Sequence, residues 1–466
     1  MTERDAAVVE RLRALLGADA VDTRPVEREF FAQDALGKRG NAGKASDPLA
    51  VVRPSDAPAV AALLKLCSEL GVAVVPYGAG TGLMGGARTE TPGVVLDLAL
   101  LNTVEVHAAD GFVWAGAGAI LADVDAELRR SGLILGHDPW TFPVASVGGP
   151  ISTNGLGYKG GRYGGMGDQV MALEVALADG TLMRTKAVRR RSTGPDLVRL
   201  FVGAEGTLGV ITAAALKAFA APEKEERRGF RFPTFEQGFY AIAEINRLGM
   251  RPSLLDYGEG HAAPWRELSS REEYAPKLYL GFEGFSEDVD AQMSRALRIV
   301  AENDGTVLPQ EDVEEFWADR HVVAERFAKN RRRGPREDRN PGLAFDFMHV
   351  TLPASQTLAF RESCHAAAER EGVAILECGL WLGPELFSGA FAVPDAEGGH
   401  ERLSAFMKGR LEEAQDRGGS MEYVHGAGTR LADLMEREQG TAFEVLRRLK
   451  GVLDPQGVVN PGKLGL

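Results

Sequence analysis

The sequence VAVVPYGAGTGLMGG, residues 72–86, joins an apolar run to a loop in which nearly every other residue is glycine. The apolar run predicts a buried strand that ends at Pro76. The glycines allow backbone conformations with φ > 0 and leave N–H groups uncovered by side chains. We therefore expect the loop to bind an anionic group, and a pyrophosphate is the best candidate.

Two common glycine motifs do not explain this loop. The spacing G-x-G-x-x-G begins at Gly80, but the dinucleotide fingerprint requires that the loop open a helix. Here Pro92 and Gly93 interrupt the chain, and residues 94–98 predict another strand. No Gly-Lys-Ser/Thr closes the loop as in a P-loop. Taken alone, the loop is equally compatible with a glycine-rich turn that binds nothing.

A second stretch of small residues lies at 146–157, with the sequence SVGGPISTNGLG. Asp138 and Pro139 precede it, and its end offers hydroxyl and amide donors. Two such loops, each following a strand, can hold an extended cofactor from both sides. The second loop therefore favours a ligand over a plain turn.

Together the two loops resemble the FAD domain of the vanillyl-alcohol oxidase superfamily, also called FAD-linked oxidase type 4. The segments GAEGTLGVIT at 203–212 and NPGK at 460–463 match two further motifs of that family, in the expected order. The resemblance implies FAD as cofactor. It is expected to be non-covalent, because relatives that attach the flavin at the first loop carry a histidine where this chain has Thr81. A covalent site in a cap domain stays open.

The resemblance also implies which residues contact the cofactor. They are the small and polar residues of the four motifs. The expected contacts are Pro76, Gly78, Ala79, Gly80, Thr81, Gly82, Gly85, Asp138, Pro139, Ser146, Gly148, Gly149, Thr153, Asn154, Gly157, Glu205, Gly206, Gly209, Val210, Ile211, Asn460 and Lys463.

Length and composition set the class of protein. A chain of 466 residues is expected to hold two or more domains. Its net charge of −13 argues against a nucleic-acid partner. Three scattered cysteines form neither a disulfide framework nor a thiolate metal site, which fits a reducing compartment. The first 17 residues predict a charged amphipathic helix, and no apolar run reaches the roughly 18 residues of a membrane span. We expect a soluble, cytoplasmic protein.

Residues 1–221 predict a FAD-binding domain of two α+β lobes. A helix is expected from the cap at Ser55 to Gly71, and another over 121–130. Asp179-Gly180 between two apolar segments is a strong hairpin pattern. It implies antiparallel pairing and not a doubly wound sheet.

Residues 222–422 predict an inserted cap with the order βαββαβ twice, that is, two ferredoxin-like units whose sheets can join into one antiparallel sheet. Strands are expected over 229–232, 253–257, 277–283, 306–308, 344–352, 373–378, 387–393 and 420–424, and helices over 235–248, 287–302, 355–369 and 400–417. The charged segment 330–340 is expected to be a surface loop between the halves. Residues 423–466, with a helix over 441–453, are expected to return to the FAD domain. The predicted fold class is α+β.

His425, in the sequence Tyr-Val-His-Gly-Ala-Gly, is the best candidate for a catalytic base. A histidine exchanges a proton near neutral pH, and the resembling family places an equivalent histidine over the flavin. Tyr423 is a further candidate at the same segment. Lys463 either supplies positive charge near the flavin ring or is a surface lysine of the tail.

Within the family the chain looks closest to the branch that oxidises 2-hydroxy acids such as glycolate and D-lactate. That branch binds a divalent metal through an HxGDGNxH stretch and the glutamate of an EHG motif. This chain has ECGLWLGPE at 377–385 and Val424 before His425, so we expect no metal. Arg320 or Arg326 can hold the substrate carboxylate instead, although either can equally be an exposed helix charge.

Three alternatives stay open. An alkyldihydroxyacetonephosphate synthase resembles the chain in lacking the metal motif. An enzyme that oxidises phenolic alcohols would need tyrosines such as Tyr257 and Tyr423. A FAD-binding subunit without turnover is the third. The expected partners are a small-molecule substrate, an electron acceptor of unknown kind and a second copy of the chain, and neither a nucleic acid nor a membrane span is expected.

Overall fold

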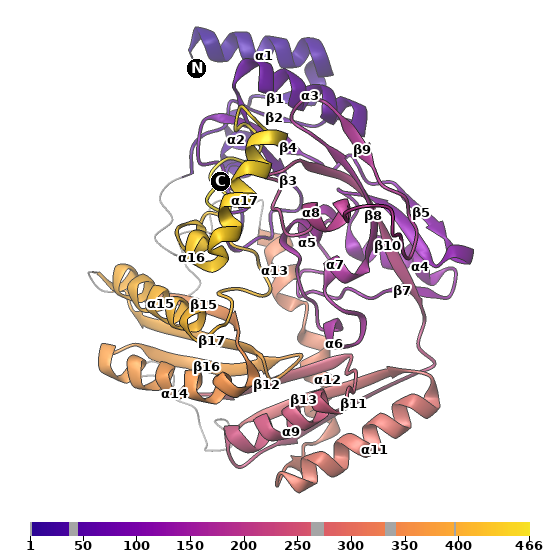
Figure 1. Ribbon diagram of the computed structural model, residues 1–466, viewed down its shortest axis with the longest axis vertical. Coiled ribbons are helices and arrows are strands. Elements are labelled where there is room, and N and C mark those ends of the chain that lie inside the picture. Colours follow the sequence, from indigo (N-terminus) through magenta and orange to yellow (C-terminus); the bar gives the residue numbers. More distant parts are fainter. Residues whose placement is uncertain (1, 37–44, 262–274, 331–341, 396–397) are drawn as a thin grey trace.

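The computed structural model describes residues 2–36, 45–261, 275–330, 342–395 and 398–466. The predicted loop at 330–340 lies almost wholly outside them. Two small sheets belong to the N-terminal half, and a large sheet belongs to the middle of the chain (Figure 1). The C-terminal segment returns to the N-terminal half, so that α17 lies near β3 and β4. None of the described helices is long and apolar enough to cross a membrane.

The first lobe is built on the four-stranded sheet β1-β2-β4-β3, and the second on a six-stranded sheet in which β10 pairs with β6, β7 and β8. The elements of both lobes are α1 (Glu3–Leu16), η1 (Ala18–Ala20), β1 (Val21–Asp22), α2 (Pro25–Phe31), β2 (Ala50–Val52), α3 (Ala57–Leu70), β3 (Ala73–Tyr77), β4 (Gly93–Asp97), β5 (Val104–His107), η3 (Ala108–Asp110), β6 (Phe112–Gly116), α4 (Leu121–Arg129), β7 (Leu133–Leu135), α5 (Gly148–Thr153), α6 (Gly160–Tyr163), α7 (Met166–Gln169), β8 (Val170–Ala176), β9 (Leu182–Arg184), α8 (Leu197–Phe201) and β10 (Val210–Ala220).

The predicted hairpin is present as the antiparallel pair β8–β9, and helices α3 and α4 lie where they were predicted. The expected cap residue of α3 was wrong by one position, because Asp56 and not Ser55 accepts the hydrogen bond from Ala59 N. The predicted antiparallel pairing holds for the second lobe and for β1 with β2, but it was wrong for the rest of the first lobe. Strand β4 runs parallel to both β2 and β3, since helix α3 crosses over between β2 and β3.

The cap contains one antiparallel sheet in the order β14-β11-β13-β12-β16-β17-β15. The two predicted ferredoxin-like units are joined by the pair β12–β16. Its elements are β11 (Lys224–Arg231), α9 (Phe235–Arg247), β12 (Leu254–Gly260), β13 (Lys277–Gly284), α11 (Ser286–Glu302), β14 (Thr306–Val307), α12 (Gln310–Asp319), α13 (Val322–Asn330), β15 (Leu343–Thr351), α14 (Ala354–Glu371), β16 (Ala374–Trp381), β17 (Leu386–Pro394) and α15 (Gly399–Asp416).

One predicted cap strand was wrong. Residues 420–424 form only an isolated bridge between Ser420 and Thr351. The reason is that the carboxylate of Glu422 accepts hydrogen bonds from the backbone N–H groups of Tyr423, Val424 and His425. These N–H groups are therefore not available to a strand partner.

The chain ends with η5 (Ala432–Leu434), α16 (Met435–Gln439) and α17 (Thr441–Leu453). Helix α17 begins and ends as predicted, and the tail after it pairs with β3, because Asn460 N donates to Val74 O at 2.8 Å. Lys450 Nζ and the carboxylate of Asp454 hold the turn between helix and tail. The tail is thus fixed to the strand that precedes the first glycine loop.

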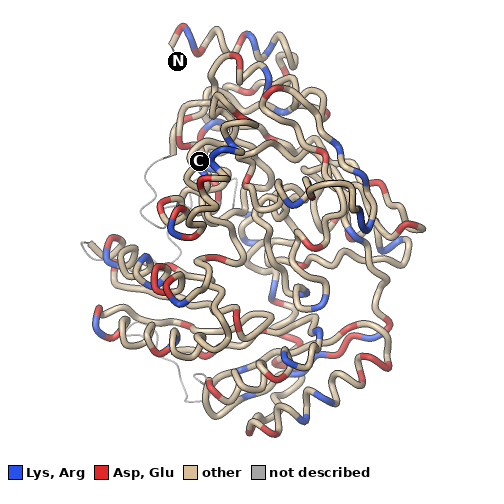
Figure 2. The backbone as a smooth tube through the Cα atoms, in the orientation of Figure 1, with Lys and Arg blue, Asp and Glu red and all other residues tan. Residues whose placement is uncertain are grey.

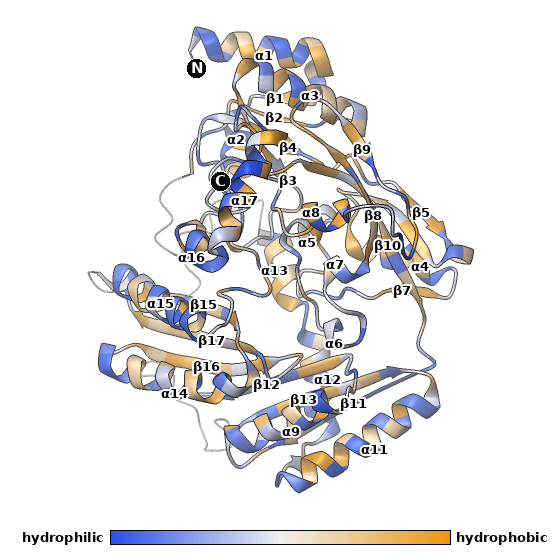
Figure 3. Cartoon of the chain, viewed as in Figure 1, coloured by the Kyte–Doolittle hydropathy of each residue, from blue (hydrophilic) through white to orange (hydrophobic). Residues whose placement is uncertain are grey.

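The two faces of the cap sheet differ in what covers them. One face packs with α9, α11, α14 and α15 in a core that includes Phe282, Phe360 and Phe391. Figure 3 shows both hydrophobic and hydrophilic residues on α11, as expected of a helix with one buried side. Figure 2 shows residues of both charge signs along these helices. The other face carries α12, where Tyr279 of β13 stacks on Phe316. It is turned toward the lobes, since Trp381 of β16 meets Tyr158 of the second lobe.

Candidate active site

The first glycine loop is packed against two other candidate segments. A Cβ on Gly78 would lie 2.3 Å from Ser146 Oγ, and one on Gly85 would lie 2.3 Å from Thr429 Oγ1. Gly80 and Gly85 have positive φ angles of 66° and 80°. The loop therefore meets the second loop at Gly78 and the C-terminal segment at Gly85, and a larger residue at either position would displace the neighbouring hydroxyl.

Ser146 provides a test of whether a cofactor fits here. Its Oγ is buried next to Gly78 and has no hydrogen-bond partner among the described residues. A buried hydroxyl without a partner is costly, and an anion between two glycine loops would satisfy it. The donor set therefore fits the pyrophosphate of FAD.

The second loop contains a short helix that the sequence did not predict. Helix α5 covers Gly148–Thr153 and ends at Asn154, whose φ is 52°. The side chain of Asn154 accepts a hydrogen bond from Gly167 N at 3.1 Å. A Cβ on Gly157 would lie 2.7–2.8 Å from backbone atoms of Asp138. Glycine is thus required at position 157, because the backbone of Asp138 lies directly against the end of the loop.

Glu205 joins the third motif to the C-terminal segment. Its carboxylate accepts hydrogen bonds from Ala427 N at 2.7 Å and from Gly428 N at 3.0 Å. Its carbonyl oxygen accepts one from Asn460 Nδ2 at 2.6 Å. Burial raises the pKa of Glu205 to about 7. Three predicted motifs therefore meet at this one residue.

The remaining residues of the third motif have packing roles. Gly206 lies against Pro76, and Gly209 lies against Ala176 and Val175 of β8. Val210 and Ile211 are buried in the core of the lobes. Any cofactor contact they make must therefore come from their backbone.

Lys463 is fully buried, so the alternative of a surface lysine was wrong. Its Nζ donates to Arg88 O at 2.7 Å. Burial lowers its pKa to about 8, while the carboxylates of Glu90, Asp34 and Glu205 act in the opposite direction. The lysine places a positive charge near three carboxylates, of which only that of Glu205 belongs to a buried residue.

His425 lies between the second loop and the cap. The adjacent carbonyl of Val424 would be 3.5 Å from a Cβ on Gly155, and a Cβ on Gly426 would be 2.6 Å from Glu205 Oε1 and 3.3 Å from Thr153. The backbone of the histidine is therefore enclosed by the loops that are expected to hold the flavin. Its imidazole is directed to cap residues that the sequence did not single out.

Two of these cap residues are His349 and Glu422. The rings of His349 and His425 are 4.8 Å apart, and His425 Nδ1 lies 3.5 Å from Glu422 Oε1. Burial lowers the pKa of His349 to about 3, so this imidazole is neutral. Burial acts to raise the pKa of Glu422, but the two histidines and its hydrogen bonds hold that pKa below its usual value. The group is one carboxylate beside two imidazoles.

Strand alternation explains why His349 is at the site. Phe345, Phe347 and His349 are half-buried and alternate with buried Ala344, Met348 and Val350 along β15. The buried set packs with the helices, so His349 lies on the lobe-facing side. Phe347 completes the group, with its ring 5.4 Å from that of His425.

The same face of the sheet carries Asp256 and Trp381, which are direct partners on β12 and β16. Burial, with a further contribution from Glu377, raises the pKa of Asp256 to about 7. The pair of small residues Gly379 and Ser388 separates Trp381 from His349 across the sheet. The face therefore combines a carboxyl group that is partly protonated at neutral pH with aromatic side chains.

Arg320 and Asp138, both predicted, are brought together. Arg320 Nε donates to Asp138 Oδ2 at 3.2 Å, and its guanidinium lies 3.9 Å from the ring centre of Trp317. His321 Nε2 lies 3.0 Å from the other oxygen of Asp138. These contacts connect α12 of the cap to the second loop. Arg326, the other candidate, is exposed on α13.

Tyr423 lies beside His349, with ring centres 5.6 Å apart. Burial and the neighbouring carboxylates raise its pKa well above the usual value. Tyr257 points to the other side of the sheet, where its hydroxyl donates to Phe235 O at 2.9 Å. Tyr257 is therefore not available to a phenolate at the site, whereas Tyr423, which its raised pKa keeps protonated, can donate a hydrogen bond there.

Two groups of described side chains have the composition and spacing of a metal site. One is His349, Glu422 and His425, and the other is His261, His365 and Cys378. The possible ligands in the two segments that stand in place of the metal motifs, Glu377, Cys378, Glu385 and His425, do not form a third group. Glu377 and Cys378 point to opposite faces of β16, and Glu385 accepts a hydrogen bond from Asn246.

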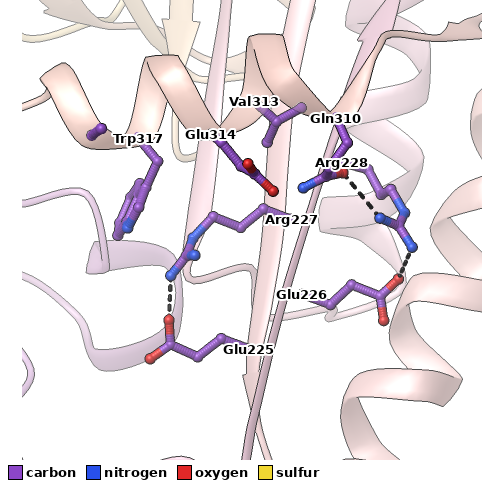
Figure 4. Close-up of a pocket in the computed structure, with 9 residues that line it drawn as sticks. Glu225, Glu226, Arg227, Arg228, Gln310, Val313, Glu314 and Trp317 are labelled. Atoms are coloured by element: carbon purple, nitrogen blue, oxygen red, sulfur yellow. Dashed lines mark hydrogen bonds and ion pairs between the residues drawn. The ribbon is translucent and has the colours of Figure 1, made fainter.

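A pocket of about 360 Å³ lies elsewhere in the cap, between β11 and α12 (Figure 4). Its two arginines are paired, because Arg227 donates to Glu225 and Arg228 donates to Glu226 and Gln310. None of the predicted site residues lines it. We do not assign it a role in the reaction.

Comparison with known proteins agrees with the geometry. Residues 48–186 match the model of the FAD binding domain, and residues 221–464 match that of the FAD linked oxidases, C-terminal domain. A D-lactate dehydrogenase of Archaeoglobus fulgidus is 28% identical over 431 residues, which is 91% of this chain and 93% of that protein. The glycolate oxidase subunit GlcD of Bacillus subtilis is 25% identical, covering 98% of this chain and 96% of the subunit. The structure of an alkyldihydroxyacetonephosphate synthase superposes with a TM-score of 0.78 at 19% identity, covering 98% of this chain and 85% of that one.

Proposed function

Because the chain belongs to the family of FAD-linked oxidases and is an FAD-dependent oxidoreductase, we propose that it oxidises a small 2-hydroxy acid to the corresponding 2-oxo acid. Two relatives that it matches over nearly its whole length carry names of enzymes for such acids. The observation that carries the proposal is the position of His425. Its backbone is fixed against the cofactor loops, while its ring faces the cap.

The residues that would hold FAD are those of the two glycine loops, with Ser146 as a hydroxyl donor. We propose that the binding is non-covalent. When bound, FAD supplies a hydride acceptor at N5 of its isoalloxazine ring. The protein must then orient the substrate and remove the proton of its hydroxyl group.

His425 is the proposed base for that proton. Glu422 Oε1 lies 3.5 Å from Nδ1 and is itself fixed by three backbone N–H groups. A fixed carboxylate beside an imidazole stabilises the imidazolium that forms when the base takes the proton. His349, held neutral by burial, and Phe347 enclose the ring and limit the access of water.

The substrate carboxylate needs a cationic or hydrogen-bonding partner. Arg320 is the proposed one, since its guanidinium is already placed between Trp317 and Asp138. Asp256 can act as a second donor, because its raised pKa keeps a share of it protonated near neutral pH. This arrangement accommodates an anion despite the acidic residues on the same face.

We also propose a cytoplasmic location and a homodimer as the state of the protein. The electron acceptor that reoxidises the flavin is a separate question, for which oxygen, a quinone and an electron-transfer protein are the candidates. The role proposed for His425 does not depend on the location, the oligomeric state or the electron acceptor.

The test is an anaerobic titration of the purified, FAD-loaded protein, followed by the flavin absorbance. The panel contains 2-hydroxy acids, phenolic alcohols and glycerol-phosphate-type compounds. Bleaching by a 2-hydroxy acid supports the proposal. Bleaching by a phenolic alcohol alone, or by nothing in the panel, contradicts it and favours the aromatic-alcohol, synthase-like or non-catalytic alternatives.

A further inference from the structure

A second group of metal-ligand side chains lies on the opposite face of the cap sheet from His425. His261 follows β12, His365 is on α14 and Cys378 is on β16. Cys378 is fully buried in the core between the sheet and its helices. Glu259 is the direct cross-strand partner of Cys378 and points to the same side. Three segments, β12 with the residue that follows it, α14 and β16, thus place a thiol, two imidazoles and a carboxylate together.

The spacing of these groups is close to that of a metal site. The ligand atoms of His261, His365 and Cys378 all lie within 4.8 Å of one another. Glu259 Oε1 is 3.3 Å from His261 Nε2 and 3.9 Å from His365 Nε2. Ligand atoms around a tetrahedral zinc ion with bonds of about 2.0–2.3 Å are about 3.3–3.8 Å apart. Binding would therefore require only a small contraction.

The two histidines share one partner, Glu259 Oε1, and neither bonds it well. Neither His261 Nε2 nor His365 Nε2 makes a hydrogen bond of good geometry within the described part of the chain, both atoms are buried, and the shared oxygen already accepts from Arg361. Buried polar atoms are normally well bonded, so two imidazole nitrogens that converge on one occupied carboxylate oxygen and one thiol call for an explanation. A bound cation supplies it.

The surrounding charges also balance. A divalent ion would be neutralised by the Cys378 thiolate and the Glu259 carboxylate. Arg361 donates two hydrogen bonds to Glu259 Oε1, at 2.7 and 2.5 Å, and its own charge is offset by Glu236 at 3.3 Å. Ligating carboxylates are commonly fixed by such outer hydrogen bonds.

We propose that Glu259, His261, His365 and Cys378 bind a zinc ion that fastens the end of β12 and strand β16 to helix α14. The mixture of sulfur, imidazole and carboxylate ligands suits zinc, and four protein ligands make a closed structural site. The proposal does not depend on the substrate of the enzyme. The sequence predicted no metal, because the active-site metal motifs of the family are missing. The site proposed here lies outside those motifs.

The first test is X-ray absorption spectroscopy of zinc in the FAD-loaded, full-length protein, purified without a polyhistidine tag. The expected result is about one zinc per chain with one sulfur ligand at about 2.3 Å. The group at His349, Glu422 and His425 contains no sulfur, so zinc with only nitrogen and oxygen ligands would place the metal there and overturn the proposal. Absence of zinc after growth in zinc-supplemented medium would overturn it as well.

The second test compares variants by metal content, with mass spectrometry after dialysis. Cys378→Ser and His365→Asn are expected to retain at least about tenfold less zinc. Cys364→Ser is the matched control, because Cys364 is a buried cysteine on the same helix as His365 but outside the group. Equal zinc loss in Cys364→Ser, or unchanged zinc in Cys378→Ser, contradicts the site. If Cys378→Ser does not fold, the absorption spectrum of the unmodified protein decides.

Discussion

Oε1 of Glu205 accepts a hydrogen bond from the backbone N–H of Ala427 at 2.7 Å, across more than two hundred residues of sequence. The same carboxylate accepts a hydrogen bond from the backbone N–H of Gly428, three residues after His425. The segment that carries the candidate base is therefore positioned from two sides, by Glu205 of the lobes through Ala427 and Gly428 and by Glu422 of the cap through the N–H of His425 itself. A substitution of Glu205 should therefore shift the position of His425.

Glu205→Gln should change how stability depends on pH. Burial raises the pKa of Glu205 from 4.5 to about 7. Between these values the folded protein keeps a proton that the unfolded chain has lost, so this group's contribution to stability falls as pH rises. The difference in unfolding free energy, variant minus wild type, should increase from pH 4.5 to 7 by about 1–3 kcal/mol and then level off. Urea unfolding in excess FAD measures it, and a difference that is constant with pH contradicts the assignment.

Gly157→Ala should weaken FAD retention. The new Cβ would approach backbone atoms of Asp138 to 2.7–2.8 Å, which forces the second loop to move. Such overpacking costs about 1–3 kcal/mol. Gly451→Ala is the control, since a Cβ there meets nothing within 4 Å. FAD content after gel filtration checks the pair, and equal retention in both variants would mean that the loop does not hold the cofactor.

Glu422→Gln should slow flavin reduction without loss of FAD. The amide can still accept the backbone hydrogen bonds but removes the negative charge beside His425. We expect the anaerobic reduction rate to decrease by roughly 10- to 100-fold. This is less than the decrease of about 10⁴-fold in kcat that follows when the aspartate of a catalytic triad is replaced by asparagine. Glu438→Gln serves as control, because Glu438 also accepts from a backbone N–H, that of Met421, away from the histidines. Equal rates in the two variants would remove Glu422 from the mechanism.

Arg320→Lys should raise KM for the hydroxy acid more than it lowers kcat. Lysine cannot keep the contact with Asp138 and offer a planar pair of donors to the substrate at once. An increase in KM of about tenfold corresponds to the loss of one charge-assisted hydrogen bond. Arg326→Lys, at an exposed position of the next helix, should leave both constants unchanged. If Arg320→Lys also leaves KM unchanged, the substrate carboxylate is held elsewhere.

The sequence was sufficient for features that depend on local pattern. The joined ferredoxin-like units, the hairpin at Asp179-Gly180 and the exact bounds of α17 follow from periodicity and turn residues. The return of the C-terminal segment to the FAD domain was expected from the family motifs, and the close approach of Gly85 to Thr429 agrees with it.

Other features depend on contacts between distant residues and were not predicted. His349 looks like one polar residue in a strand until the sheet places it 4.8 Å from His425. Its alternation with buried Met348 and Val350 was the only available indication. Glu422 was missed because a strand was expected there, and its carboxylate instead caps the backbone. The burial of Lys463 likewise requires the fold, since tail lysines are usually exposed.

The most direct test of His425 as the base is rapid anaerobic mixing of a 2-hydroxy acid with the wild-type protein and with His425→Asn, monitored by flavin absorbance. We expect fast bleaching of the wild type and a reduction rate lower by roughly 10²–10⁴-fold in the variant, with FAD content equal in both. Equal reduction rates in the two proteins would contradict His425 as the base. Failure of the wild type to bleach with any 2-hydroxy acid would contradict the proposed substrate class.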